Sequence, residues 1–193
     1  MVAILLLSVL VLPYVVEMVI SLTVRRWKRR DYFRRAREKA RLTGKPLMVI
    51  GDPDTGCVNH YFGRDYDCGD VCLDLTGCPR CPDGTRKIRG SLEEALPGMP
   101  TGGYVVFVSC TLEYVEGIRS VVDELQRVSG GDLYVVNVEP YSPLHFLLKT
   151  RQILTSAPPD SQAIAWKPVP PVYRWLHGIY DPISRPFMKG TYD

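Results

Sequence analysis

An apolar run occupies residues 1–24 and is followed at once by a dense basic block at residues 25–45. The run contains no Lys, Arg or Asp, and its one charged residue is Glu17. A helix of this length is about 36 Å long and would cross a hydrocarbon core of about 30 Å with some tilt. The pattern therefore predicts a single transmembrane helix over residues 1–24.

The alternative for this run is a cleaved signal peptide, but no basic segment precedes it and no small-residue cleavage site follows it. Because Lys and Arg that flank a span stay on the cytoplasmic side, residues 25–193 are expected in the cytoplasm. The protein is thus expected to be a single-pass membrane protein. The basic block predicts a juxtamembrane helix that ends at Gly44 and contacts anionic lipid. A topology signal alone and a nucleic-acid patch are the alternatives.

The net charge separates the basic block from the rest of the chain. The whole chain carries +3, residues 25–45 contribute +9, and residues 1–24 contribute −1. Residues 46–193 therefore carry −5, which argues against a nucleic-acid-binding surface on that part.

Residues 46–140 alternate between short apolar strands and helical segments, as in one α/β domain. Helices are expected at residues 91–96, where Ser91 and Glu94 form a capping box, and at residues 112–128, where apolar side chains share one stripe. Strands are expected at residues 46–51, 71–75, 87–90, 104–110 and 132–139. The predicted fold class is α/β, with a small, Rossmann-like, mostly parallel sheet. Residues 141–193 form a tail rich in Pro and aromatic residues, with no assigned role.

Polar residues follow several of the predicted strands, where an open parallel sheet binds its ligand. Asp74 ends its strand, and a carboxylate in that place can accept both hydroxyls of a ribose. Asp52 and Asp54 are placed to orient a cationic or hydroxylated ligand. The alternative is that residues 52–56 form only a turn, since Asp, Pro and Gly favour turns in any case. The predicted rim comprises residues 52–56, Asp74, residues 90–92, residues 109–113 and Glu139.

Two segments, YVVFVSCTLEYV at residues 104–115 and ELQRVSGGDLYVV at residues 124–136, resemble the class I S-adenosylmethionine (SAM)-dependent methyltransferases. In that family a strand ends in a segment like "L-E-H-V", and a helix "EL-x-R-V-x-x-G-G" and a further strand follow. The resemblance extends loosely over residues 46–140. It implies a SAM site in which Asp74 holds the ribose, Ser91 and Leu92 lie near adenine, and residues 109–113 lie near the methyl donor. The predicted cofactor-binding residues are Gly51, Asp52, Asp54, Gly56, Asp74, Ser91, Leu92, Ser109 and Cys110, and no catalytic residue is assigned.

The chain departs from that family in its first loop, where only Gly51 and Gly56 stand for the glycine-rich motif. Residues 57–70 lack helical periodicity where the family has a helix. Two functions follow from these observations. The first is a membrane-anchored SAM-dependent methyltransferase-like protein with an unidentified methyl acceptor and either an active or a degenerate cofactor site. The alternative is a non-catalytic structural or scaffolding protein of a membrane assembly, that of a virus included.

Five of the six cysteines lie between residues 57 and 81, and two of them form a C-x-x-C motif, Cys78 to Cys81. This pattern indicates a zinc site. A typical site of this kind has two C-x-x-C motifs, and here the second pair, Cys68 and Cys72, is separated by three residues instead of two. Cys72 is interpreted as a core residue. The cytoplasm would keep these thiols reduced, and free or buried thiols without metal are the alternative. The expected ligands are Cys68, Cys78 and Cys81, with either Cys57 or His60 as the fourth.

Overall fold

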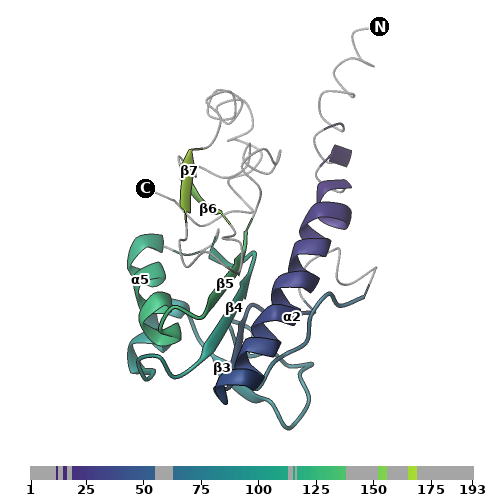
Figure 1. The fold of residues 1–193 in the computed structure, drawn as a ribbon. Helices are drawn as coiled ribbons and strands as arrows, with labels where there is room; N and C mark the ends of the chain where they lie inside the picture. The colour runs from purple at the N-terminus through teal and green to yellow at the C-terminus, as the bar shows by residue number, and fades with distance from the viewer. Residues whose placement is uncertain are drawn as a thin grey trace, which may run out of the picture.

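A computed structural model of the chain has one five-stranded sheet with helices on both faces (Figure 1). It describes residues 12, 15–16, 19–54, 63–112, 115, 117–137, 152–155 and 165–168. The strand order is β3-β2-β1-β4-β5, and every neighbouring pair is parallel. The predicted α/β fold with a parallel sheet is therefore confirmed. The strands are β1 Leu47–Ile50, β2 Val71–Asp74, β3 Arg86–Arg89, β4 Val105–Ser109 and β5 Leu133–Val136.

Alternate residues of the central strands point to opposite faces of the sheet, as the two-residue period of a strand requires. In β1, Met48 and Ile50 join one core cluster, whereas Leu47 and Val49 join the other. All four are essentially inaccessible to solvent. Strands buried on both faces read as continuous apolar runs, which is why β1 and β4 were predictable from sequence.

The first face is covered by α4 (Leu92–Ala95), η2 (Leu96–Gly98) and α5 (Ile118–Ser129). The predicted cap of α4 is confirmed, because Ser91 Oγ accepts a hydrogen bond from the backbone N–H of Glu94 at 3.3 Å. The expected helix over residues 112–128 begins only at Ile118. Its N-cap, Gly117, adopts a left-handed conformation with φ +64°, which no continuous right-handed helix can include.

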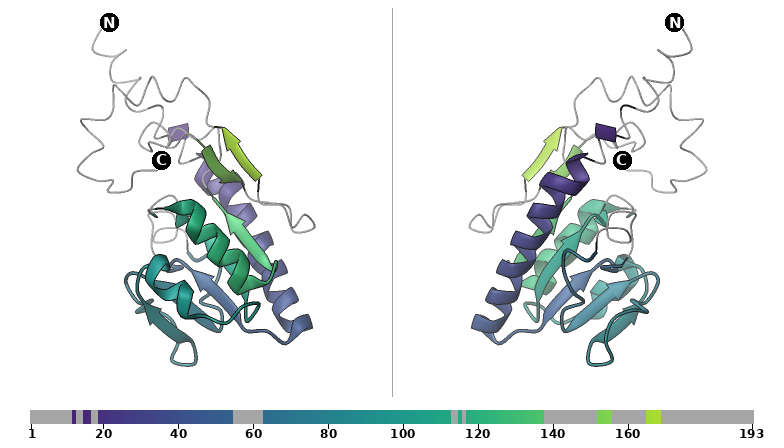
Figure 2. Two further views of the ribbon diagram at one scale, coloured as in Figure 1. Left: turned by 90° about the vertical axis from the view of Figure 1, so that its left-hand side faces the viewer. Right: turned by 90° about the vertical axis from the view of Figure 1, so that its right-hand side faces the viewer.

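The opposite face is covered by α2 (Arg26–Thr43), which follows the short π-helix η1 (Ser21–Arg25) (Figure 2). Phe33 packs against Phe107 of β4, with ring centroids 5.3 Å apart, and against Tyr66 at 5.9 Å. The helix ends as predicted at Gly44, which has φ +68°. The helix expected beside a membrane thus forms part of the core of the α/β unit.

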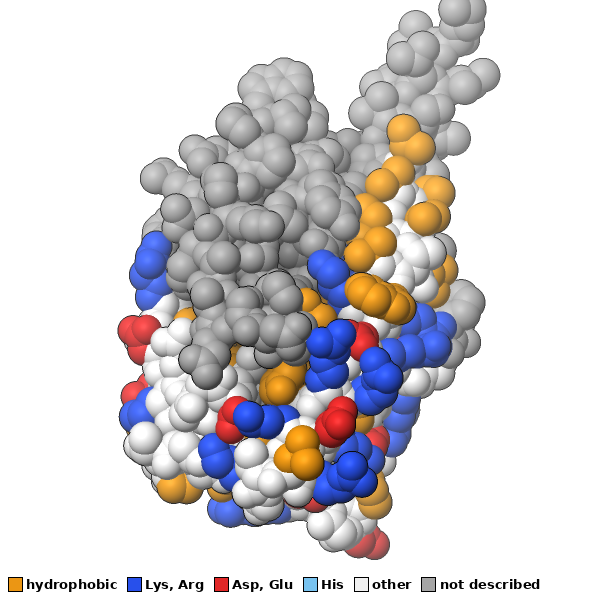
Figure 3. Space-filling model, viewed as in Figure 1, with side chains coloured by type: hydrophobic (Ala, Val, Ile, Leu, Met, Phe, Trp, Pro, Cys, Tyr) orange, Lys and Arg blue, Asp and Glu red, His pale blue; other side chains and the backbone are white. Residues whose placement is uncertain are grey.

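The basic side chains of residues 25–45 are largely paired with carboxylates of the same chain, although they gather visibly along α2 (Figure 3). Asp65, whose side chain is fully buried, receives Arg26 at 2.5 Å, Arg30 at 3.1 Å and Arg29 at 3.7 Å. At least eight of the eleven basic residues form such ion pairs. These eight cations share four carboxylates, so the basic block contributes to the packing of α2 and still keeps a net positive charge.

The apolar N-terminal run is described only at residues 12, 15–16 and 19–24. Across the part of the chain that the structure describes, no helix is both long enough and apolar enough to cross a membrane. Large apolar side chains are nevertheless exposed there, at Leu12, Val15, Val16 and Val19. In the C-terminal tail, β6 (Gln152–Thr155) pairs antiparallel with β7 (Ala165–Pro168), and the other residues of 141–193 lie outside the described part.

Candidate functional site

A hollow of about 640 Å³ opens at the carboxyl ends of the central strands. The chain runs from β1 to β2 on one side and places β4 on the other, so the strand order reverses between β1 and β4. Ligands of open parallel sheets bind at such a switch point. The hollow is lined by Ile50, Gly51, Leu73, Asp74, Leu75, residues 90–94, residues 109–111 and Val115.

Gly51 is the residue that lets the backbone turn at this switch point. Its φ is +96°, and a Cβ atom there would lie 2.6 Å from Thr111 Oγ1 and 3.3 Å from the carbonyl oxygen of Ser109. The Gly51 N–H donates to the Leu73 carbonyl at 3.0 Å, which ties the end of β1 to β2. A side chain at this position would fill the space between β1 and β4 and strain the turn.

Asp74 lies on the hollow, where sequence analysis placed the ribose-binding carboxylate. Its Oδ2 accepts the Asp52 N–H at 3.0 Å, and its Oδ1 accepts the Thr76 N–H at 2.7 Å and the Thr76 hydroxyl at 2.6 Å. A carboxylate offers about four acceptor positions. Three of them are used by the chain itself, so a ribose that takes two hydrogen bonds has to displace the Thr76 hydroxyl.

Asp52 and Asp54 form a closed turn. Asp52 is buried, and its Oδ1 accepts the Asp54 N–H at 2.9 Å. Asp54 forms an ion pair with Arg64. Neither carboxylate lines the hollow, so at residues 52–54 this geometry favours the turn interpretation, and residues 55 and 56 lie outside the described part. The predicted cofactor residue Gly56 is therefore not placed.

Two further parts of the lining follow the ends of β3 and β4. Ser91, which caps α4, and the buried Leu92 come after β3, and Ser109 and Cys110 come at the end of β4. Cys110 has a left-handed φ of +49°, and its Sγ accepts a hydrogen bond from Arg29 of α2 at 3.3 Å. Six of the nine predicted cofactor residues thus line one hollow: Gly51, Asp74, Ser91, Leu92, Ser109 and Cys110.

The sequence did not indicate Arg29 and Tyr66, which contact the lining residues Cys110 and Ser109. Burial raises the pKa of Tyr66 to about 12, against the opposing effects of Arg29 and a hydrogen bond with Ser109. Helical spacing offered a signal for Arg29, since it precedes the buried Phe33 and Ala36 by four and seven residues. Its place in a run of basic residues concealed this pattern.

The hollow is acidic. Asp74, Glu93 and Glu94 line it, and none of the described lining residues is Lys, Arg or His. Phosphate groups are normally bound by cations, by helix N-termini or by glycine-rich loops. The hollow includes the first residues of the four-residue helix α4, but its three carboxylates and the lack of a cation among its described lining residues disfavour a polyphosphate and favour a ligand that carries positive charge.

Four cysteines lie between β1 and β3: Cys68 precedes β2, Cys72 lies within it, and Cys78 and Cys81 follow it. Cys68, Cys78 and Cys81, three of the expected zinc ligands, are brought together with Cys72 in one buried cluster. Cys57 and His60 lie outside the described residues. The thiols expected to be reduced are instead joined as two disulfides, Cys68–Cys81 and Cys72–Cys78, because each pair of sulfurs lies within bonding distance. Cys72 is buried in its strand as expected, but it belongs to this cluster.

Comparison of the chain with protein-family models, with curated proteins and with solved structures finds no match.

Proposed function

We propose that the hollow binds SAM and that the chain is a SAM-dependent methyltransferase-like protein attached to a membrane. The observation that carries this proposal is the acidic hollow at the switch point, with Asp74 at the end of β2. SAM has a positive sulfonium, an adenosine ribose and no phosphate, so it suits a site with three carboxylates and no cation among its described lining residues. The fold supports the proposal through its parallel strands and its glycine at the end of β1.

Methyl transfer needs only that the acceptor be held in line with the sulfonium and lose a proton to a base or to water. Cys110 and Thr111 lie on the wall where the resemblance places the methyl donor. No described residue is assigned as the base. Cofactor binding is accordingly the first claim to test, and transfer to an acceptor is the second.

A specific contact favours the non-catalytic alternative. The Asp74 carboxylate already accepts hydrogen bonds from Asp52 and Thr76, so it can serve to close the loops after β1 and β2. In a structural or scaffolding protein, that role would be sufficient to retain the carboxylate. If Asp74 binds the cofactor, loss of its charge should lower the affinity for SAM. If Asp74 only closes the two loops, loss of its charge should lower the stability of the fold.

The test is calorimetric titration of SAM, S-adenosylhomocysteine and ATP into the full chain in detergent micelles. The full chain is needed because α2 forms part of the core. We expect micromolar affinity for the first two ligands, no binding of ATP, and at least a tenfold loss in Asp74→Asn, about 1.4 kcal/mol. Asp123→Asn, an exposed carboxylate on α5, is the matched control. If the folded protein binds neither SAM nor S-adenosylhomocysteine, the SAM proposal is contradicted and the structural or scaffolding function is favoured.

We propose further that the apolar N-terminal run attaches the protein to the membrane, with residues 25–193 on the cytoplasmic side. Leu12, Val15, Val16 and Val19 have the i, i+3, i+4, i+7 spacing of one helical face, and all are exposed. Vesicle flotation should retain the wild-type chain and lose the variant Val15→Lys/Val19→Lys. The eight ion-paired cations of the basic block share only four carboxylates, so the block keeps a net positive charge, and we expect tighter binding to anionic than to neutral vesicles.

A further inference from the structure

We propose that Cys68, Cys72, Cys78 and Cys81 bind one Zn²⁺ as four thiolates when they are reduced, and that the two disulfides are the metal-free, oxidised form of the same site. The inference concerns a different face from the hollow, since no residue of this cluster lines it. It assigns the fourth ligand to Cys72.

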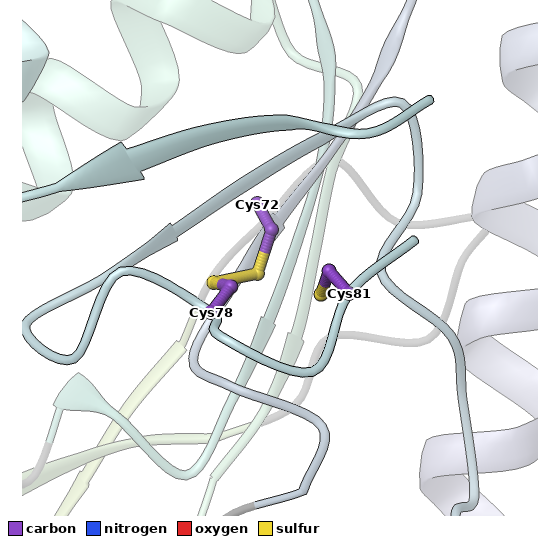
Figure 4. Close-up of side chains that lie close together, drawn as sticks. All are labelled: Cys72, Cys78 and Cys81. Carbon is purple, nitrogen blue, oxygen red and sulfur yellow. A yellow bond between two sulfur atoms is a disulfide. The ribbon is translucent and has the colours of Figure 1, made fainter. Parts of the chain in front are cut away.

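The four cysteines form a core cluster of their own. Their exposed fractions are 2%, 0%, 0% and 4%, and no other buried side chain among the described residues belongs to the group. The sulfurs of Cys72, Cys78 and Cys81 lie within 4.8 Å of one another, and Cys68 is bonded to Cys81 (Figure 4). All four sulfurs therefore converge on one small volume, which two independent structural disulfides would not require.

The distances suit a tetrahedral zinc site. With Zn–S bonds of about 2.3 Å, the sulfurs of such a site lie about 3.8 Å apart. The sulfur of Cys81 lies within 4.8 Å of the sulfurs of Cys72 and Cys78, so it has to approach each of them by about 1 Å or less, while each bonded pair has to separate. Cys68 is held at the cluster by its bond to Cys81.

The backbone holds the ligands from three places. Cys72 lies within β2, whose neighbours β1 and β3 fix it on both sides. Cys78 has φ +51°, and its carbonyl accepts the Cys81 N–H at 3.1 Å, so the C-x-x-C segment forms a tight turn. Cys68 precedes Gly69, whose N–H donates to Asp67 at 2.9 Å. A C-x-x-C turn with two further cysteines supplies the four ligands of a structural zinc site.

Positive charge lies beside the cluster. Four thiolates and one Zn²⁺ carry a formal charge of −2, which is costly to bury without compensation. Lys87 of the edge strand β3 is paired in register with Cys72, so the two side chains point to the same face of the sheet. Arg80 lies between the two cysteines of the C-x-x-C turn. These cations would offset the charge of the metal site.

The two forms interconvert by ordinary thiol chemistry. A two-electron oxidant such as a peroxide takes two electrons from one thiolate pair, a disulfide bond forms, and with two protons the peroxide becomes two waters. Two equivalents convert all four thiolates to two disulfides and release Zn²⁺ without change in its oxidation state. The loop between β2 and β3, which has no helix among its described residues, is cross-linked in either form.

The test is metal analysis of the full chain purified with a phosphine reductant and dialysed against metal-free buffer that contains no chelator. We expect about one zinc per chain, loss of that zinc in Cys72→Ser, and its retention in Cys110→Ser and Cys57→Ser. Two equivalents of peroxide should release the zinc. Retention in Cys72→Ser together with loss in Cys57→Ser would overturn the assignment, and a reduced wild-type chain without zinc would overturn the site.

A second measurement covers the case in which Cys72→Ser fails to fold. Alkylation of the reduced wild-type chain with and without zinc, followed by peptide mass mapping, identifies the protected thiols directly. We expect protection at Cys68, Cys72, Cys78 and Cys81, with Cys57 and Cys110 labelled in both samples. Labelling of Cys72 at the same rate with and without zinc would contradict the proposal.

Discussion

The guanidinium of Arg29 on α2 donates a hydrogen bond to the sulfur of Cys110 at 3.3 Å, across the edge between α2 and the end of β4. Burial alone lowers the pKa of Arg29, but Cys110, Tyr66 and Asp65 outweigh it and raise the pKa above its ordinary value. A cation in contact with a thiol stabilises the thiolate, which is the reactive form. The helix that looks like a membrane-side segment in the sequence therefore reaches the candidate site.

The first prediction concerns the reactivity of Cys110. In Arg29→Gln we expect iodoacetamide to label Cys110 roughly three- to tenfold more slowly at neutral pH, because the thiolate loses its cation. Arg34→Gln, which removes an exposed arginine paired with Asp31, is the control and should leave the rate unchanged. Peptide mass mapping of the full chain gives both rates. Equal rates in wild type and Arg29→Gln would mean that the contact has no chemical effect.

The second prediction concerns α2 as part of the core. Phe33→Ala removes a ring that packs on Phe107 and Tyr66, so it should lower the free energy of unfolding by about 3–5 kcal/mol. Leu42→Ala, on the same helix but 73% exposed, should change it by less than about 0.5 kcal/mol. Urea denaturation in detergent measures both. A small effect of Phe33→Ala on the free energy of unfolding would indicate that α2 is a separate juxtamembrane helix and does not belong to the core.

The third prediction concerns the turn at the end of β1. Gly51→Ala places a methyl group against Thr111 and the Ser109 carbonyl at a positive φ, and should destabilise the fold by about 1–3 kcal/mol. Gly84→Ala is the control, because a Cβ there meets no atom within 4 Å and its backbone φ is not positive. If the two variants unfold at the same urea concentration, the close contact of Gly51 with Thr111 and the Ser109 carbonyl would be contradicted.

The fourth prediction is an alkaline instability due to Tyr66. Its pKa is raised from 10 to about 12, mainly by burial, so between pH 10 and pH 12 the unfolded chain ionises the phenol while the folded chain does not. The contribution of Tyr66 to stability is full below pH 10 and falls by about 2–3 kcal/mol as the pH rises to 12. Unfolding free energies across this range should fall less steeply in Tyr66→Phe than in wild type. Parallel curves would contradict the prediction.

The central strands were predictable because strands buried on both faces leave a continuous apolar signal, as β4 does from Val105 to Val108. The position of Asp74 followed from the end of its strand. The pairing of Asp52 with Asp54 and Thr76 did not, because hydrogen bonds within a turn leave no periodic trace. The role of Arg29 was hidden for another reason: its partner Cys110 is 81 residues away, and charge patterns report only local neighbours.

The cysteine cluster shows the same limit. The spacing identified Cys78 and Cys81 as one motif, but Cys72 was predicted to be an apolar core residue. The alternation of a β-strand shows that Cys72 is buried, and it does not show that its neighbours on that face are the other cysteines. The expectation of reduced thiols rested on a cytoplasmic orientation inferred from basic residues. At least eight of those residues pair with carboxylates within the fold, so their number reflects packing as well as topology.

The most direct test of the central claim is hydrogen–deuterium exchange of the full chain with and without SAM. SAM binding at the switch point predicts slower exchange of backbone amides at residues 50–52, 73–76, 90–94 and 109–112, and no change along α5. Exchange that is identical in both samples, or protection confined to residues away from these four segments, would contradict the proposed site.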